Sequence, residues 1–264
     1  NETNFKRFLM IVKSAGFIDP KLVRSKNVFN FAYILYLVLR NEKYQSGLIE
    51  SYVRRWFVLS ILTKRYSGSP ESAFDFDVKK LSKGNFPKFL SEVEKAELSD
   101  AFWDASLIQS LNTSVFSSPY FHVFLASQVK NNDKGFLSKD ISVNNLITHR
   151  GDIHHVFPKD YLKKHGLKRA QYNQIANYVY MQSEININIG NKSPDIYFKE
   201  LENQCVVGIE KYGSICDLNE LKKNLKMNCV PLDIFNMNID HYEYFLAQRR
   251  KLIAEKLKRY YYGL

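Results

Sequence analysis

The stretch Asp152-Ile-His-His-Val-Phe-Pro158 carries the most informative chemical pattern in the sequence. Its β-branched and aromatic residues predict a short strand, which Pro158 ends because proline cannot donate to a ladder. Four of the six histidines lie within the seventeen residues 149–165, and His154 and His155 are adjacent. Successive side chains of a strand point to opposite faces, so the two rings must do different work unless the backbone bends there. In one possible division of roles, one histidine binds a metal and its neighbour transfers a proton.

Hydrolysis of a phosphodiester bond needs such a division. A base must activate water, a cation must neutralise the charge that builds on the phosphate, and the leaving oxygen must be stabilised. A neutral imidazole suits the first role because its unperturbed pKa, about 6.5, lies near neutral pH. A hard divalent ion with oxygen or imidazole ligands suits the second role.

Two later segments add to this pattern, Asn177-Tyr-Val-Tyr-Met-Gln-Ser-Glu-Ile-Asn186 and Ile189-Gly-Asn-Lys-Ser-Pro194. With the histidine stretch they resemble the HNH (ββα-metal, His-Me finger) endonucleases. More narrowly, they resemble the C-terminal nuclease part of the GmrSD-type, modification-dependent restriction and phage-defence proteins. The segments 55–70 and 249–261 also look like that family. The resemblance covers most of the chain and is sharpest between residues 151 and 194.

The resemblance implies a role for each matching residue. His155 would be the general base that takes a proton from the attacking water, and His154 would be a metal ligand. Asn177 would be the catalytic asparagine of the motif, which hydrogen-bonds backbone in the motif loop and keeps the base oriented. The final metal ligand, nine residues further on, would be Asn186. The implied cofactor is a single Mg²⁺, or Mn²⁺ in its place.

The spacing leaves alternatives open for two of these roles. His155 and Asn177 are 22 residues apart, more than in compact members of the family, so the helix-like insert 159–170 must loop out. Asn173 is a rival for the middle position. An amide is a weak ligand compared with His or Asp, and three other residues could replace or assist Asn186: Asn188, Asn191 and Asp152.

The rest of the chain predicts a mainly α fold, a helical bundle with a small ββα-metal (HNH) element in its second half. Residues 1–130 read as successive helices, because apolar residues recur at helical spacing, as in 48–64. The polar stretch 131–150 predicts a connecting loop and a boundary. We therefore expect a helical domain in 1–130 and an HNH-like nuclease domain with a C-terminal basic helix in 131–264. His122, inside an apolar run, is expected to be a hydrogen-bonded core residue.

The charge balance favours polyanionic partners, since 38 Lys and Arg stand against 27 Asp and Glu and the net charge is +11. Much of this charge is in the last helix, where residues 249–259 carry a net +5. Its candidate DNA contacts are Arg249, Arg250, Lys256 and Arg259, although such a run is as often the wet face of an amphipathic helix. The family resemblance also implies a nucleotide-binding domain or subunit before this chain. The Asp-Gly-Gln-Gln-Arg motif of that domain is absent here, so NTP hydrolysis is not assigned.

Other classes of protein fit the sequence less well. Three cysteines without a C-x-x-C pair argue against a disulfide framework or a zinc knuckle. The longest apolar run, 28–39, is too short for a bilayer, so no membrane partner is expected. The start lacks both Met and a signal pattern, which suggests a fragment of a longer cytoplasmic protein. The leading hypothesis is a metal-dependent HNH-type DNA endonuclease. Its alternative is a non-catalytic nucleic-acid-binding or interaction module with a decayed site.

Overall fold

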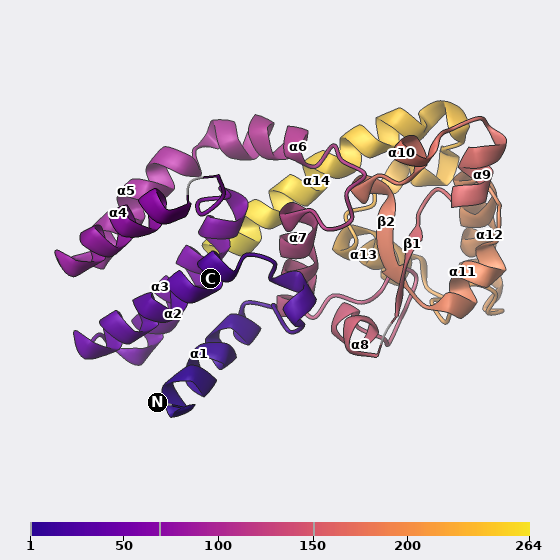
Figure 1. Ribbon diagram of the computed structural model, residues 1–264. Helices are drawn as coiled ribbons and strands as arrows, with labels where there is room; N and C mark the ends of the chain where they lie inside the picture. Colours follow the sequence, from indigo (N-terminus) through magenta and orange to yellow (C-terminus); the bar gives the residue numbers. More distant parts are fainter. Residues whose placement is uncertain (1, 69, 150) are drawn as a thin grey trace.

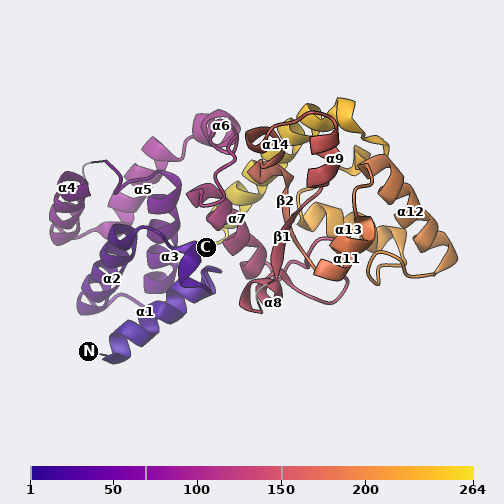
Figure 2. The same ribbon diagram turned by 45° about the vertical axis from the view of Figure 1, so that its right-hand side comes forward.

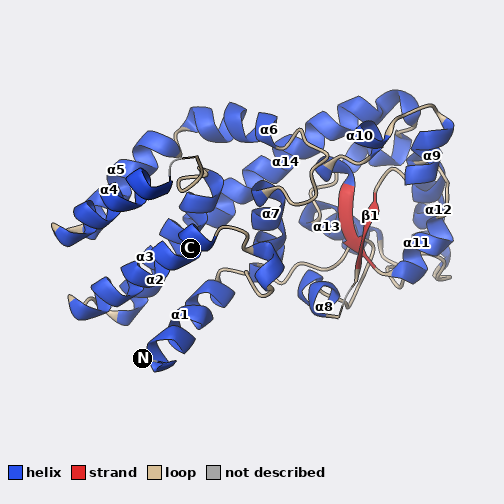
Figure 3. Ribbon diagram, viewed as in Figure 1, coloured by secondary structure: helices blue, strands red, loops and turns tan. Residues whose placement is uncertain are grey.

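The computed structural model describes residues 2–68, 70–149 and 151–264, and helices dominate it, as expected (Figure 1, Figure 3). The first half folds into helices that pack side by side. Their bounds are α1 (Glu2–Ser14), α2 (Lys26–Asn41), α3 (Ser46–Leu62), α4 (Pro70–Ser82), α5 (Phe86–Glu97), α6 (Leu107–Ser110) and α7 (Pro119–Lys130). Short 3-10 or π turns join some of them, at Pro20–Leu22 and Phe102–Ser106.

The second half places two short strands among further helices. Its elements are α8 (Val143–Thr148), β1 (Asp152–His155), α9 (Lys159–Lys164), α10 (Arg169–Tyr172), β2 (Tyr178–Met181), α11 (Ser183–Ile189), α12 (Pro194–Val207), α13 (Leu218–Met227) and α14 (Tyr242–Tyr262). β1 and β2 are antiparallel, and Asp152 pairs with Met181 while His155 pairs with Tyr178. The expected insert 159–170 is observed as α9 and the start of α10, which leave and return to the sheet.

The buried side chains form two hydrophobic clusters, and α14 contributes to both. Phe245 and Leu246, near its start, belong to the cluster around the strands, whereas Leu257 and Tyr260 belong to the cluster of the first half. Figures 1 and 2 show α14 (yellow) extending from the side of the molecule that holds the strands toward the N-terminal helices. The two halves of the chain therefore share one long helix.

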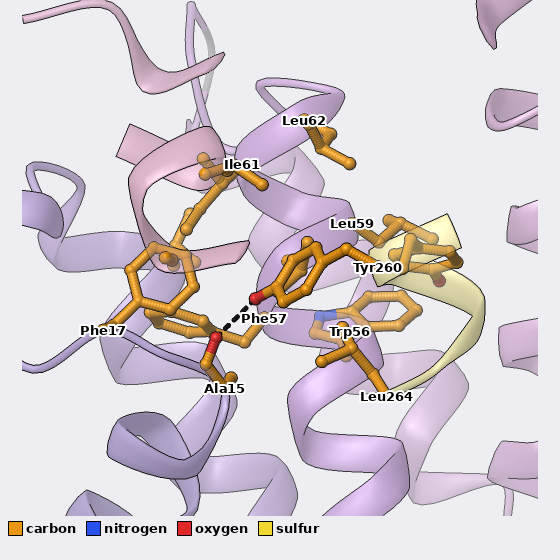
Figure 4. Packing of buried hydrophobic residues seen from close by; sticks show 14 of the residues in the cluster. Ala15, Phe17, Trp56, Phe57, Leu59, Ile61, Leu62, Tyr260 and Leu264 are labelled. Atoms are coloured by element: carbon orange, nitrogen blue, oxygen red, sulfur yellow. Dashed lines mark hydrogen bonds between the residues drawn. The ribbon is translucent and has the colours of Figure 1, made fainter. Parts of the chain in front are cut away.

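The end of α14 is fastened in the first cluster by both apolar and polar contacts. Tyr260 packs beside Trp56 and Phe57 of α3, and its hydroxyl donates to Ala15 O at 2.6 Å (Figure 4). The contact joins residues 245 positions apart, so the C-terminus closes onto the N-terminal helices. Truncation of the last turn would expose this core.

Residues 131–149 of the polar stretch 131–150 are packed in the structure and contain α8, so they are more than the loop expected from the sequence, and residue 150 lies outside the described residues. Phe136 and Leu137 are fully buried. Phe136 N donates to Tyr180 O at 2.8 Å, which sets this segment beside β2. The Asn224 side chain of α13 accepts from Leu137 N at 2.8 Å and donates to the carbonyls on either side. Amide side chains from a distant helix thus satisfy the backbone of a segment that has few ladder bonds of its own.

None of the helices in the described ranges combines the length and the apolar character that a membrane crossing requires.

Candidate active site

The paired histidines lie on β1, which pairs with β2 after the insert of α9 and α10, and α11 follows β2 (Figure 3). α11 begins two residues after β2 ends, so the two segments of the motif meet in one small unit. This order agrees with the ββα arrangement expected from the sequence. Its assignment as an HNH element stays a prediction.

Asn177 immediately precedes β2 and holds the chain that leaves β1. Its side chain is fully buried. Oδ1 accepts from Phe157 N at 2.8 Å, and Nδ2 donates to Phe157 O at 3.0 Å and to Tyr172 O at 3.3 Å. Its carbonyl also accepts from Val156 N at 2.9 Å. The backbone contact expected of the motif asparagine is therefore present, and it fixes the residues directly after His155.

His155 is half-buried, and two neighbours hold its ring. Nε2 lies 3.0 Å from Asn173 Oδ1, and the Tyr178 ring meets it edge-on with centroids 5.1 Å apart. Burial is the main reason that the pKa of His155 falls to about 4, although the bond to Asn173 acts in the opposite direction. The ring is therefore neutral at pH 7, the form that a general base requires. Asn173, the rival for the middle position, instead contacts the ring itself.

His154 has a buried nitrogen that no described residue satisfies. Its Nε2 has no hydrogen-bond partner in the described part of the chain. The pKa of His154 is lowered, mainly by burial, although the nearby Asp152 carboxylate acts in the opposite direction. A buried polar atom without a partner calls for an explanation, and a missing ion is one of the recognised ones. An imidazole with a free lone pair fits the role of metal ligand expected for this residue.

Among the other ligand candidates, Asp152 is on β1, and the three asparagines are on or after α11. Asn186 is half-buried, Asn191 is exposed, and the exposed Asn188 already donates to Lys211 O at 3.0 Å. Within the described ranges, no group of three or more His, Cys, Asp or Glu could hold a metal ion. A metal at His154 would therefore depend on amide oxygens, on Asp152 or on the substrate. The ligand set His154 and Asn186 stays a prediction.

Tyr197 of α12, which was not predicted from the sequence, supports the site, and Glu200 of the same helix holds the segment that precedes it. Tyr197 is fully buried, and its hydroxyl donates to Val156 O at 2.9 Å, next to the residue that Asn177 holds. Glu200 pairs with Lys192 of the Gly-Asn-Lys-Ser-Pro segment at 2.8 Å and with Lys211 at 2.9 Å. Pro194 predicts the start of a helix, and Tyr197 lies three residues later, about one helical turn. Residues at this spacing lie on the same side of a helix, so this spacing is the signal that could have pointed to Tyr197.

Part of the basic face expected on α14 is buried, which corrects the prediction of DNA contacts for three residues. Arg249 is fully buried and donates to Ala176 O at 2.9 Å and Asn228 O at 3.1 Å. Lys256 is buried against Asp133, and Arg250 is 9% exposed. α14 lies between two cores, and three of the six cations in residues 249–259 are buried. Arg259 alone of the four is exposed, and it lies 3.9 Å from Glu255.

Comparison with known proteins leaves the family of the chain open. The chain matches no known family profile and no solved structure. It is 27% identical over 224 residues to the uncharacterized protein MJ0686 of Methanocaldococcus jannaschii. That alignment covers 78% of this chain and 36% of the archaeal protein, so the chain spans about a third of the length of this relative. The resemblance to HNH and GmrSD-type proteins stays a prediction.

Proposed function

We propose that this chain is a metal-dependent HNH-type DNA endonuclease and forms the nuclease part of a restriction or phage-defence protein. The observation that carries the proposal is the contact of Asn177 with both backbone polar groups of Phe157. The buried Asn177 amide, next to β2, holds the backbone of Phe157, which lies two residues after the neutral His155, and so fixes the direction of that histidine.

The contact with Asn173 assigns the atoms of His155. With Asn173 Oδ1 as the acceptor at 3.0 Å, Nε2 carries the hydrogen and Nδ1 keeps its lone pair. Nδ1 would then accept the proton of the attacking water, while Asn173 and Tyr178 keep the ring from turning. The lowered pKa keeps Nδ1 unprotonated at neutral pH, at the cost of weaker intrinsic basicity.

His154 Nε2, together with oxygens from Asn186 or Asp152, would hold the cation. A bound Mg²⁺ or Mn²⁺ would neutralise the charge that develops on the phosphate and the leaving oxygen. The partner is DNA, supported by the net charge of +11. Because Arg249, Arg250 and Lys256 are buried, the duplex would have to be bound mainly by other surfaces. A nucleotide-binding domain or subunit remains part of the proposal, in keeping with the greater length of the archaeal relative.

The test is cleavage of supercoiled plasmid by this chain in Mg²⁺ or Mn²⁺. His155→Ala should lower the rate by about 10²- to 10⁴-fold, the usual worth of a general base. His165→Ala is the matched control, because His165 is exposed and its ring contacts the carbonyl and the ring of Tyr161, which is outside the candidate site. Equal rates for the parent and His155→Ala would refute the proposed base.

The same experiment tests the second candidate, a non-catalytic nucleic-acid-binding module with a decayed site. The absence of a three-residue His, Cys, Asp or Glu group in the described ranges favours it. This candidate predicts DNA retention without cleavage by the parent or by any variant. The nuclease proposal predicts cleavage that chelation of the metal abolishes.

A further inference from the structure

A pocket of about 360 Å³ in the helical half has features that the nuclease proposal does not use. It lies where the segment before α2, the end of α3 and the start of α7 meet, and α3 packs against both other helices (Figure 1). Leu22, Val28 and Ile61 provide an apolar wall. Arg24 and Lys64 add two cations to the pocket, and His122 adds an imidazole ring that can become positively charged.

The electrostatic character of the pocket is positive. Arg24 and Lys64 are exposed at its edge, and the described residues that line it include no Asp or Glu. The Lys64 ammonium lies 5.3 Å from the centre of the Tyr120 ring, which restricts its position. Ser25, the N-cap of the 16-residue helix α2, also lines the pocket, so the positive end of the helix dipole is directed there.

A buried hydroxyl gives a second, independent indication of a ligand. Ser60 lines the pocket and is fully buried, yet its Oγ has no hydrogen-bond partner in the described part of the chain. Thr63, on the same helix, bonds back to Leu59 O at 2.9 Å, as helical hydroxyls commonly do. A buried donor left without a partner is costly unless a ligand completes it.

We propose that this pocket binds a small organic phosphate. Arg24 and Lys64 would pair with the phosphate group, Ser60 Oγ and the His122 ring would donate to it, and the apolar wall would contact the organic body. The volume lies within the range of small-ligand sites, which are about 300–1,000 Å³. The proposal is independent of the nuclease proposal, since none of these residues belongs to the candidate active site.

The burial and the charged surroundings of His122 support the same inference. His122 is 5% exposed, which confirms the core position expected from the sequence. Burial first, and then the charge of Arg24, lower its pKa to about 4. Its charged surroundings in the pocket are Arg24 and Lys64, both cations. A bound dianion would offset them and raise the pKa of the ring.

Calorimetric titration of the purified chain tests the proposal, with inorganic phosphate, glucose 6-phosphate and adenosine monophosphate as probes and sodium chloride as the blank. At least one organic phosphate should bind saturably and at least tenfold more tightly than inorganic phosphate. Equal affinity for all phosphates would refute the role of the apolar wall. The absence of saturable binding by any probe would refute the site.

Variants then locate the binding. Arg24→Gln and Lys64→Gln should each weaken it about tenfold or more, the usual worth of a charge-assisted hydrogen bond. Lys26→Gln is the matched control, because Lys26 is an exposed cation of the same helix start that lines a different cavity. Ser60→Ala should weaken binding without lowering the melting temperature, since it removes an unpaired hydroxyl.

Titration of the His122 ring by NMR gives a readout that does not depend on stability, and its pKa should rise when the ligand is bound. Binding that Arg24→Gln and Lys64→Gln leave unchanged, or a His122 titration that the ligand does not move, would overturn the proposal.

Discussion

Asn177 makes two hydrogen bonds to Phe157, twenty residues earlier, accepting from its N–H at 2.8 Å and donating to its carbonyl at 3.0 Å. Both residues are fully buried. One side chain thus replaces the two ladder bonds that would otherwise continue β1 beside β2. The strand can therefore end at His155 without leaving buried polar groups unpaired, and the chain is free to turn into α9.

This relationship predicts a large loss of stability in Asn177→Ala. The change leaves a buried N–H and a buried carbonyl of Phe157 without partners, so the free energy of unfolding should fall by about 2–4 kcal/mol. Urea denaturation measures the loss. Asn173→Ala is the control, because Asn173 is half-buried and contacts the His155 ring instead of backbone. It should lose less than about 1 kcal/mol while cleavage still falls. Equal destabilisation by both changes would contradict the role assigned to Asn177.

Arg249 predicts a second structural effect, at a residue first considered for DNA binding. Burial lowers the pKa of Arg249 to about 10, and its guanidinium holds Ala176 O, one residue before Asn177. Arg249→Ala removes these bonds from the core, so stability should fall by about 3–5 kcal/mol. Arg259→Ala, on the same helix but exposed, should stay within about 0.5 kcal/mol of the parent. If the two variants unfold at the same urea concentration, α14 is not packed as described.

Glu200 predicts how stability depends on pH. Burial acts to raise its pKa, but hydrogen bonds from Lys192, Tyr212 and Lys211 together lower it to about 2. In the unfolded chain the pKa of Glu is about 4.3, so the unfolded state binds more protons between these values. The contribution is fully present above about pH 4.3 and is lost as the pH falls toward 2.

The comparison to make is Glu200→Gln against the parent, by urea unfolding from pH 6 to pH 2. The parent should be the more stable at pH 6, and the difference should shrink steadily below about pH 4.3. Glu202→Gln, an exposed neighbour on α12, serves as the control and should show no such trend. A difference that is constant across this range would mean that Glu200 does not act through its charge.

The helical class, the strand at the histidines and the contact of Asn177 with the motif loop could be predicted, because each depends on a local pattern or a family spacing. The burial of three cations of α14 could not be predicted. Its charges alternate with apolar residues as they do on a wet amphipathic helix, and only the partners of Arg249 and Lys256, far away in sequence, show that the cations are buried. The packing of Leu137 was hidden for the same reason, since Asn224 satisfies its backbone from 87 residues away.

Metal dependence is the prediction that separates the roles of the two histidines. Because His154 Nε2 has no partner within the described residues, His154→Ala breaks no hydrogen bond at that atom, and any loss of stability should come only from packing. Cleavage, in contrast, should require about tenfold or more Mn²⁺ for half-maximal rate, since a ligand is lost.

Asn186→Ala should shift the same titration while leaving DNA retention nearly intact. His155→Ala should lower the rate at every metal concentration without shifting the midpoint. A midpoint that Asn186→Ala does not move would transfer the ligand role to Asn188, Asn191 or Asp152. A midpoint that His154→Ala does not move would leave its unpaired nitrogen without a metal to explain it.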